Sequence, residues 1–257
     1  MFEFQTRLIF PTHAVAPAGP LPPQAERLSV TTPDGNMLQG IYIPAEQVDP
    51  TGTLILGFGG NAWNGQDVAE YLHELYSGHD VVAFHYRGYA PSTGTPSAEA
   101  LITDAPLIYD AAVEHTKAVR VIAVGFSIGS GIVAQLSAKR KLAGLILVTP
   151  FDSLKAVAQS IYPWLPIGPF FEHEIEAAGP LKTSNVPIAM VAAGRDEIVP
   201  AERTAALRTL IPKLVHDRTI ADAGHNDIYA RSEFQLDMRT ALEEVGGNQV
   251  PPNPGTR

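Results

Sequence analysis

The chain has 257 residues, of which 45% are hydrophobic and 18% are charged, so it contains enough apolar sequence to bury one large core. Its formal net charge of -9 argues against binding to a nucleic-acid backbone, which depends on clustered Lys and Arg. The absence of cysteine excludes disulfides, thiolate metal sites and a cysteine nucleophile.

No part of the sequence reaches the roughly 18 consecutive apolar residues of a membrane span. The first segment carries Glu3 and Arg7 and meets Pro11 before the apolar core of a signal peptide can form. We therefore expect a single domain, a cytoplasmic location and no stable membrane insertion. The sequence does not specify an oligomeric state.

The predicted elements begin with an extended segment, because the prolines from Pro11 to Pro23 disfavour a helix or a central strand over residues 1–24. Residues 25–43 alternate in polarity around Pro-Asp-Gly-Asn at 33–36, which predicts a hairpin. Short apolar runs then alternate with helical patterns, which predicts an α/β fold whose mostly parallel sheet carries helices on both faces. The expected strands are 53–58, 81–85, 121–124, 145–148, 188–192 and 215–220, and the expected helices are 67–76, 98–114, 130–141, 201–210 and 229–245.

Two segments fall outside this alternation. The connection 150–187 is rich in apolar and aromatic residues, so it either forms a small cap over a pocket or packs its aromatic side chains on the edge of the sheet. The tail 246–257 is rich in proline and glycine and has nothing to bury, so we expect it to be disordered.

The residues Gly-Phe-Ser-Ile-Gly at 125–129 directly follow an expected buried strand. Such a strand-to-helix turn holds a serine in a strained conformation with its hydroxyl exposed, and glycines flank it because side chains would collide with the neighbouring strand and helix. Ser127 is therefore the candidate nucleophile. A serine needs a histidine to take its proton and a carboxylate to orient that histidine.

Both partners follow later strands in the order that this turn requires. Asp196 comes after a glycine at the end of the strand 188–192, and His225 comes after Gly224 at the end of the strand 215–220. We predict that they serve as the acid and the base. The alternative is that they are polar residues that form turns.

Other histidines are weaker candidates. His85 also ends an expected strand, but it precedes Ser127, and we interpret it as a structural residue with a satisfied hydrogen bond. The cluster Glu172-His173-Glu174 with Glu176 lacks the two-histidine spacing of a zinc site, so we interpret it as a solvated helical face and expect no metal.

Acyl transfer also needs two N–H donors for the developing oxyanion. The amide of Ile128 is one, and the glycine-rich loop after the strand 53–58 supplies the other from Asn61, with Ala62 as the neighbouring possibility. The same loop matches the G-x-G-x-x-A pattern of dinucleotide binding. That pattern also needs an acid at the end of the next strand, but Asp80 stands at its beginning, so no nicotinamide cofactor is expected.

Six motifs together resemble the α/β-hydrolase superfamily, and more narrowly the serine hydrolases of its depalmitoylase-like branch and their bacterial relatives. The resemblance extends from about residue 26 to residue 242. The chain departs from the family at Gly59, where histidine is usual, and at Ala90, where glycine is usual. The motifs are Phe-Gly-Gly-Asn-Ala at 58–62, Tyr-Arg-Gly-Tyr-Ala-Pro-Ser at 86–92, Gly-Phe-Ser-Ile-Gly at 125–129, Pro-Phe-Asp-Ser-Leu at 150–154, Gly-Arg-Asp at 194–196 and Gly-His-Asn-Asp-Ile at 224–228.

The resemblance implies that Ser127, Asp196 and His225 are the nucleophile, acid and base of a serine esterase or thioesterase. We expect a small acyl substrate and no metal or organic cofactor. A peptidase or amidase using the same triad, and a binding protein without catalysis, are the alternatives. Short to medium acyl chains are preferred because four aromatic residues of the long connection could line an apolar site: Phe151, Trp164, Phe170 and Phe171.

Overall fold

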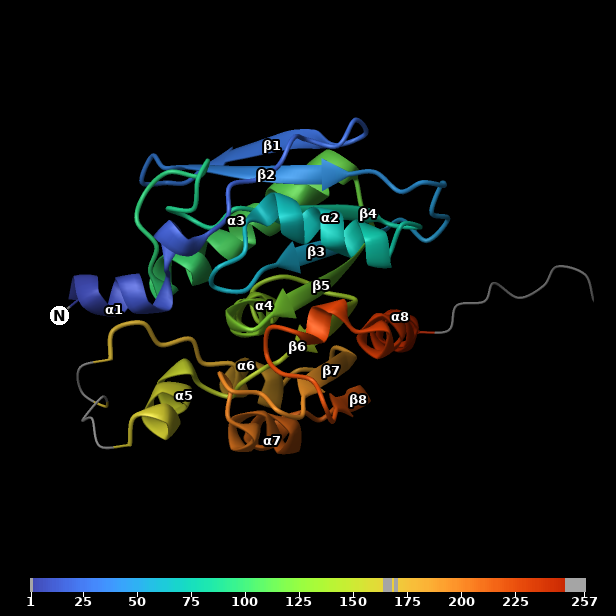
Figure 1. Ribbon diagram of the computed structural model, residues 1–257. Helices are drawn as coiled ribbons and strands as arrows, with labels where there is room; N and C mark the ends of the chain where they lie inside the picture. Colours follow the sequence, from blue (N-terminus) through green and yellow to red (C-terminus); the bar gives the residue numbers. More distant parts are fainter. Residues whose placement is uncertain (1, 164–167, 169–170, 248–257) are drawn as a thin grey trace, which may run out of the picture.

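A single eight-stranded sheet runs through the middle of the protein in the computed structural model, which describes residues 2–163, 168 and 171–247 (Figure 1). The strand order is β1-β2-β4-β3-β5-β6-β7-β8, and β2 pairs antiparallel with both β1 and β4, whereas all other pairs are parallel. The predicted hairpin and mostly parallel sheet are confirmed. The strands are β1 (Glu26–Thr31), β2 (Met37–Ile43), β3 (Thr53–Phe58), β4 (Asp80–Phe84), β5 (Arg120–Phe126), β6 (Gly144–Val148), β7 (Ile188–Ala193) and β8 (Leu214–Ile220).

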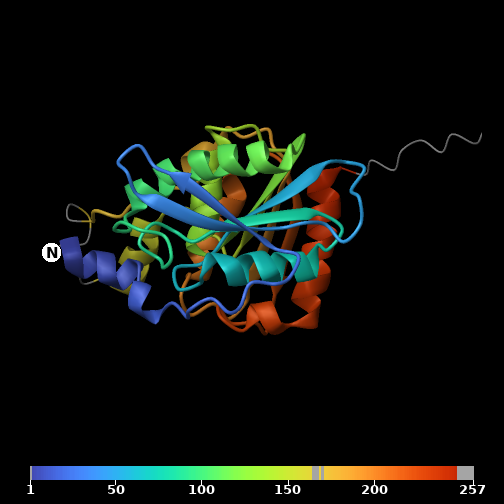
Figure 2. The same cartoon turned by 90° about the horizontal axis from the view of Figure 1, so that it is seen from above.

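Helices cover both faces of this sheet, which Figure 2 shows from above. On one face α3 and α4 pack against each other, and α6 and α7 continue the layer; α2 and α8 lie on the other face. The α/β class predicted from the sequence is therefore confirmed. The helices are α1 (Phe2–Ile9), α2 (Gly65–Leu75), α3 (Ala98–Thr116), α4 (Ile128–Ser137), α5 (Leu154–Ile161), α6 (Ala178–Lys182), α7 (Ala201–Leu210) and α8 (Ser232–Gly246), with short 3-10 turns at Thr12–Ala14 and Ile228–Ala230.

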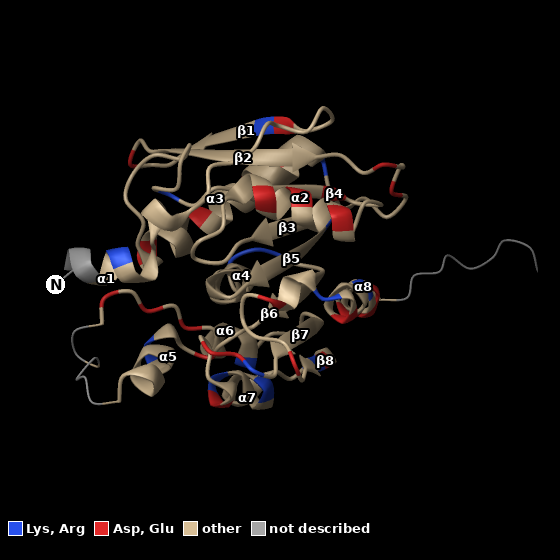
Figure 3. Cartoon of the chain, in the orientation of Figure 1, with Lys and Arg blue, Asp and Glu red and all other residues tan. Residues whose placement is uncertain are grey.

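The central strands are buried on both faces because both are covered by helices. All residues of β3, β6 and β7 are buried, and none of them is charged. Figure 3 shows charged residues on the helices, the loops and the outer strands β1 and β8. The parallel register places Phe58 beside Gly125 and Phe126 beside Val148. The carboxyl ends of β3, β5 and β6 therefore lie at one edge of the sheet.

Side chains at the helix starts explain why the helices begin where they do. Asn64 accepts a hydrogen bond from the Asp67 amide at the start of α2, and Ser97 accepts one from the Ala100 amide at the start of α3. Both bonds satisfy amides that have no partner within the helix. Helices α2 and α8, like the other helices expected from the sequence, lie within a few residues of their predicted bounds.

The N-terminal segment differs from the prediction. The extended lead-in expected over residues 1–24 is wrong for its first part, because α1 occupies Phe2–Ile9 and ends before Pro11, so no proline interrupts it. The helix is held by contacts with a distant part of the chain. Thr6 Oγ1 lies 2.8 Å from His173 Nε2, and the ring of Phe10, which is buried, meets the ring of His173 edge to face.

The connection 150–187 contains α5 and α6 and an isolated bridge between Ser153 and Glu176. His173 is fully buried and lies outside any helix, so the expectation of a solvated helical face is wrong. Glu174 also points inward, because its carboxylate accepts hydrogen bonds from the Ser153 hydroxyl and the Leu154 amide at the start of α5. The cluster therefore stabilises local structure.

The aromatic residues expected to line an acyl site have different places. Phe151 is buried in the core, where its ring packs against α4 beside Gly131, so it does not line a site there. Phe171 is half-buried, while Trp164 and Phe170 lie outside the described residues. Most of the tail expected to be disordered, residues 248–257, also lies outside them. Within the ranges that the structure describes, none of the helices has the length and apolar character needed to span a lipid bilayer.

Candidate active site

Ser127 lies at the carboxyl end of β5, in the sharp turn before α4. Its backbone has φ 51° and ψ -115°. Residues other than glycine rarely adopt this conformation, and those that do are often found at functional sites. The turn is tightly packed: a Cβ atom on Gly125 would lie 2.5 Å from the Gly129 carbonyl oxygen, and one on Gly129 would collide with the Phe58 carbonyl oxygen. Only glycine fits at the two flanking positions, as the sequence indicates.

His225 follows β8 in a loop that reaches back to this turn. Its Nε2 lies 3.0 Å from the Ser127 Oγ, and the residue is only 5% exposed. The backbone amide of His225 donates a hydrogen bond to Glu197 Oε2 over 3.1 Å, and the preceding amide of Gly224 donates to Asp227 Oδ1 over 2.8 Å. Two carboxylates therefore fix the histidine loop.

Asp196 follows β7 and lies behind the imidazole. Its two carboxylate oxygens lie 2.9 and 2.8 Å from His225 Nδ1, and its Oδ1 accepts hydrogen bonds from the amides of Ile198 and Val199. A carboxylate at Nδ1 favours the tautomer in which that nitrogen carries the proton, which leaves Nε2 free to accept one from Ser127. The structure thus brings together the three side chains that the sequence predicts for the triad.

Backbone hydrogen bonds keep the loops after β7 and β8 side by side. The amide of Gly194 donates to the Ile220 carbonyl, and the amide of Arg195 donates to the Ala223 carbonyl, each over 2.8 Å. These bonds continue the parallel ladder beyond the strands. The acid and the histidine therefore meet although they come from separate segments.

The loop after β3 lies against the nucleophile turn. A Cβ atom on Gly60 would be 3.8 Å from Ser127 Cβ, so the backbone comes close to the serine at this point. In the described part of the chain, neither the backbone N–H of Asn61 nor that of Ile128 donates a hydrogen bond to another protein group. Asn61 and Ile128 remain the predicted oxyanion donors.

Gly59 stands where the family usually has histidine, and α2 explains why this chain has glycine there. A Cβ atom on Gly59 would lie 2.8 Å from Val68 Cγ2, so α2 packs too closely for a side chain. Gly57 is crowded by Leu72 and Val68 of the same helix. The glycines of the dinucleotide pattern thus have a packing role. Asp80, the first residue of β4, accepts hydrogen bonds from the Tyr42 hydroxyl and the Ala45 amide.

His85, the other strand-end histidine, has the structural role expected of it. It is 2% exposed, and its Nδ1 accepts a hydrogen bond from the Gly65 amide at 3.2 Å. Burial, assisted by the charge of Arg27, lowers the pKa of His85 to about 4, so the ring is neutral near pH 7. It fixes the start of α2.

An aromatic cluster joins the nucleophile strand to the histidine loop. The ring centroid of Trp63 lies 5.2 Å from that of Phe126 and 5.4 Å from that of Tyr229. The Tyr71 hydroxyl donates to the Tyr229 carbonyl at 2.9 Å, and burial raises the pKa of Tyr229 to about 12. The cluster stabilises the face of the sheet beneath the two loops.

Several residues of the site have no clear signal in the sequence. Glu197 could have been suspected because it directly follows Asp196, but nothing marks Asp227 as a partner of the Gly224 amide. Asn61 Nδ2 donates to the Ile9 carbonyl of α1, a helix that the prolines obscure. Ala90, the second departure from the family pattern, is exposed.

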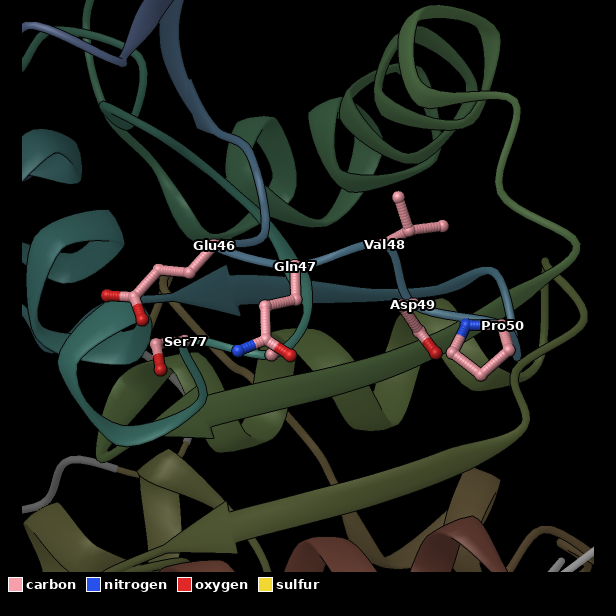
Figure 4. A pocket seen from close by; sticks show the side chains of 7 residues that line it. Glu46, Gln47, Val48, Asp49, Pro50 and Ser77 are labelled. Atoms are coloured by element: carbon pink, nitrogen blue, oxygen red, sulfur yellow. The ribbon is translucent and has the colours of Figure 1, made fainter.

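A hollow of about 340 Å³, lined by both polar and apolar residues, lies away from the triad (Figure 4). It is formed by the segments that precede β3 and β4, at the ends of these parallel strands opposite to the one that carries Ser127. It is therefore separate from the triad. Its lining residues are Glu46, Gln47, Val48, Asp49, Pro50, Ser77 and Gly78.

Known proteins share both the sequence pattern and this architecture. The uncharacterized protein Rv2307c of Mycobacterium tuberculosis is 31% identical over 251 residues, which cover 94% of this chain and 85% of the relative. Protein bem46 of Schizosaccharomyces pombe is 25% identical over 268 residues, covering 93% and 89%. The esterase Pf2001 of Pyrococcus furiosus has the same fold, with a TM-score of 0.70 at 19% identity over 91% of this chain and 96% of the esterase. Residues 54–180 match the model of the alpha/beta hydrolase fold. The chain belongs to the α/β-hydrolase family.

Proposed function

We propose that this protein is a serine hydrolase that cleaves a carboxylic ester or thioester through an acyl-enzyme intermediate. The observation that carries the proposal is the continuous series of contacts from Ser127 Oγ through His225 to the Asp196 carboxylate. A buried carboxylate, an oriented imidazole and a half-buried serine on a strained turn together form a nucleophile with its base. Membership of the α/β-hydrolase family supports the same reaction class.

In the first half of the reaction, His225 Nε2 takes the hydroxyl proton as Ser127 Oγ forms a bond to the substrate carbonyl carbon. The carbonyl oxygen becomes an oxyanion, which the amides of Asn61 and Ile128 stabilise by hydrogen bonds. When the carbonyl re-forms, the bond to the alcohol or thiol breaks, and the leaving group takes the proton from His225. Asp196 stabilises the imidazolium in between.

Water completes the cycle by the same route. His225 takes a proton from the water as it attacks the acyl carbon, and the proton then returns to Ser127 Oγ when the bond to the serine breaks. The acid product leaves and the resting state is restored. We expect the substrate to be a small acyl compound, and this chemistry requires no metal or organic cofactor.

Fluorophosphonate labelling tests the nucleophile. The wild type should react covalently at Ser127, and Ser127→Ala should abolish the labelling because the attacking oxygen is gone. Ser137→Ala is the matched control, since its hydroxyl bonds the Ala134 carbonyl near the end of α4 and should leave labelling intact. Unchanged labelling of Ser127→Ala would contradict the mechanism.

Turnover of p-nitrophenyl esters, acyl thioesters and aminoacyl amides tests the substrate class. We expect hydrolysis of the esters or thioesters, with a rate that falls as acid protonates His225, because the protonated ring cannot act as a base. Turnover of amides alone would favour a peptidase or amidase. A rate near zero at every pH with every substrate would favour a binding protein without catalysis.

A further inference from the structure

Two tyrosine hydroxyls contact the loop that carries the Asn61 amide. Tyr86 and Tyr89 come from the segment after β4, and their rings pack edge to face with centroids 5.7 Å apart. The Tyr86 hydroxyl donates to the Gly59 carbonyl at 2.8 Å, and the Tyr89 hydroxyl donates to the Asn61 carbonyl at 2.7 Å. Both residues are buried, with exposed fractions of 5% and 1%.

These bonds hold a loop that would otherwise be flexible. Gly59 and Gly60 lack side chains, and glycine has more backbone freedom than any other residue. The Gly60 carbonyl accepts a longer bond, of 3.4 Å, from the Trp63 amide, so three successive carbonyls of the loop all have donors. With the peptide groups on either side fixed, the direction of the Asn61 N–H is fixed as well.

The direction of that N–H matters because an oxyanion donor stabilises the transition state only when it is already aimed at the position where charge develops. We propose that Tyr89, assisted by Tyr86, is a positioning residue that holds the Asn61 amide in the orientation required for oxyanion stabilisation. This inference rests on the proposed serine hydrolase function. Tyr89 touches no reacting atom and acts through the backbone of residue 61.

The surroundings of Tyr89 keep its hydroxyl protonated and in place as a hydrogen-bond donor. Burial raises the pKa of Tyr89 far above its ordinary value, so its hydroxyl keeps its proton through the alkaline range. The bond to Asn61 is therefore insensitive to pH where His225 is an active base. The hydroxyl also lies on a ring packed in the core on the side of the sheet that α3 and α4 cover, so it has little freedom to turn away.

The test compares two buried tyrosines that each donate to a backbone carbonyl. Tyr89→Phe removes only the hydroxyl that donates a hydrogen bond to the Asn61 carbonyl. Tyr76→Phe removes an equivalent hydroxyl, since Tyr76 is 3% exposed and donates to the Met238 carbonyl at 2.9 Å, but it lies between α2 and α8. Both variants lose one buried hydrogen bond, so general destabilisation affects them alike.

We expect the rate constant of fluorophosphonate labelling to fall about 10- to 100-fold in Tyr89→Phe, less than the loss of a whole oxyanion donor. The kcat of ester hydrolysis should fall by a similar factor while KM changes less than about twofold, because the amide acts in the transition state rather than in substrate binding. The acid limb of the pH profile should stay in place, since His225 is untouched. Tyr76→Phe should label at the wild-type rate.

If Tyr89→Phe is labelled at the same rate as Tyr76→Phe, the positioning role is wrong. Labelling of the wild type at Ser127 would still support the hydrolase in that case. A wild type that does not label at all would overturn both. Should Tyr89→Phe fail to fold, Tyr86→Phe takes its place, with a smaller fall of labelling expected because the Gly59 carbonyl is one peptide further from the donor. An unchanged rate in that variant would count equally against the inference.

Discussion

The serine and the histidine of the candidate active site are held in place by different physical means. Ser127 is fixed by packing, because Gly125 and Gly129 touch the backbone of neighbouring elements so closely that no side chain fits. His225 is fixed by hydrogen bonds from loop amides to two carboxylates, Glu197 and Asp227. A close-packed turn tolerates almost no added side-chain atom. Hydrogen bonds to carboxylates can be removed one at a time by substitution, and they weaken when acid protonates the carboxylate.

The comparison predicts its largest effect at Gly129. Gly129→Ala places a methyl group against the carbonyl oxygens of Phe58 and Gly59, which are backbone atoms and can yield only if β3 or α4 shifts. We expect a loss of about 3 kcal/mol in unfolding free energy, measured by chemical denaturation, together with loss of fluorophosphonate labelling. Gly78→Ala is the control, because a Cβ atom there meets nothing within 4 Å. Equal stability of the two variants would refute the packing argument.

An intermediate effect is expected at Glu197. Glu197→Ala removes the acceptor of the His225 amide and leaves the triad side chains intact. We expect kcat to fall about tenfold, equivalent to roughly 1.4 kcal/mol, because the imidazole is less well oriented, with little change in unfolding free energy. Glu243→Ala, an exposed site on α8, should behave as the wild type. If kcat of Glu197→Ala matched this control, the carboxylate would have no part in holding the histidine.

The smallest effect concerns Asp227 and depends on pH. The Arg231 side chain and the Gly224 amide hold the pKa of Asp227 below its ordinary value. A carboxyl whose pKa is lower in the folded state contributes stability that is complete above its unfolded pKa and is lost as pH falls through its folded pKa. Asp227→Asn keeps an oxygen acceptor but not the charge, so the wild type should be slightly more stable near pH 7.

The difference between wild type and Asp227→Asn should vanish in strong acid, where the wild-type carboxyl is also neutral. Chemical denaturation at a series of pH values measures it. A difference that stays constant down to the acid limit would show that the charge of Asp227 does not stabilise the histidine loop.

The sequence was sufficient to predict the sheet and the meeting of the three triad side chains. Apolar runs between helical patterns define parallel strands, and parallel strands bring their carboxyl ends to one edge. A glycine-flanked serine and two later loop residues then have to lie close together. The distances of 3.0 and 2.8 Å at His225 agree with this reasoning, while the catalytic roles remain our proposal.

What the sequence did not reveal depends on contacts between distant segments. Helix α1 is short, so its stability depends on tertiary packing rather than propensity, and its partner His173 lies far along the chain. Phe151 is buried because α4 has a glycine opposite its ring. The bonds of Tyr86 and Tyr89 end on backbone carbonyls, which are identical at every residue and leave no pattern to read.

The aromatic cluster beneath the site has a spectroscopic consequence. The chain contains two tryptophans, and Trp63 lies against both Phe126, which precedes the nucleophile, and Tyr229, which follows the histidine loop. Its indole is thus an intrinsic fluorophore between the strand that carries Ser127 and the loop that carries His225. Replacing Trp164 by phenylalanine would leave Trp63 as the single tryptophan. If Ser127 is acylated as proposed, we expect the emission of Trp63 to change, and stopped-flow fluorescence would time that step without any attached dye.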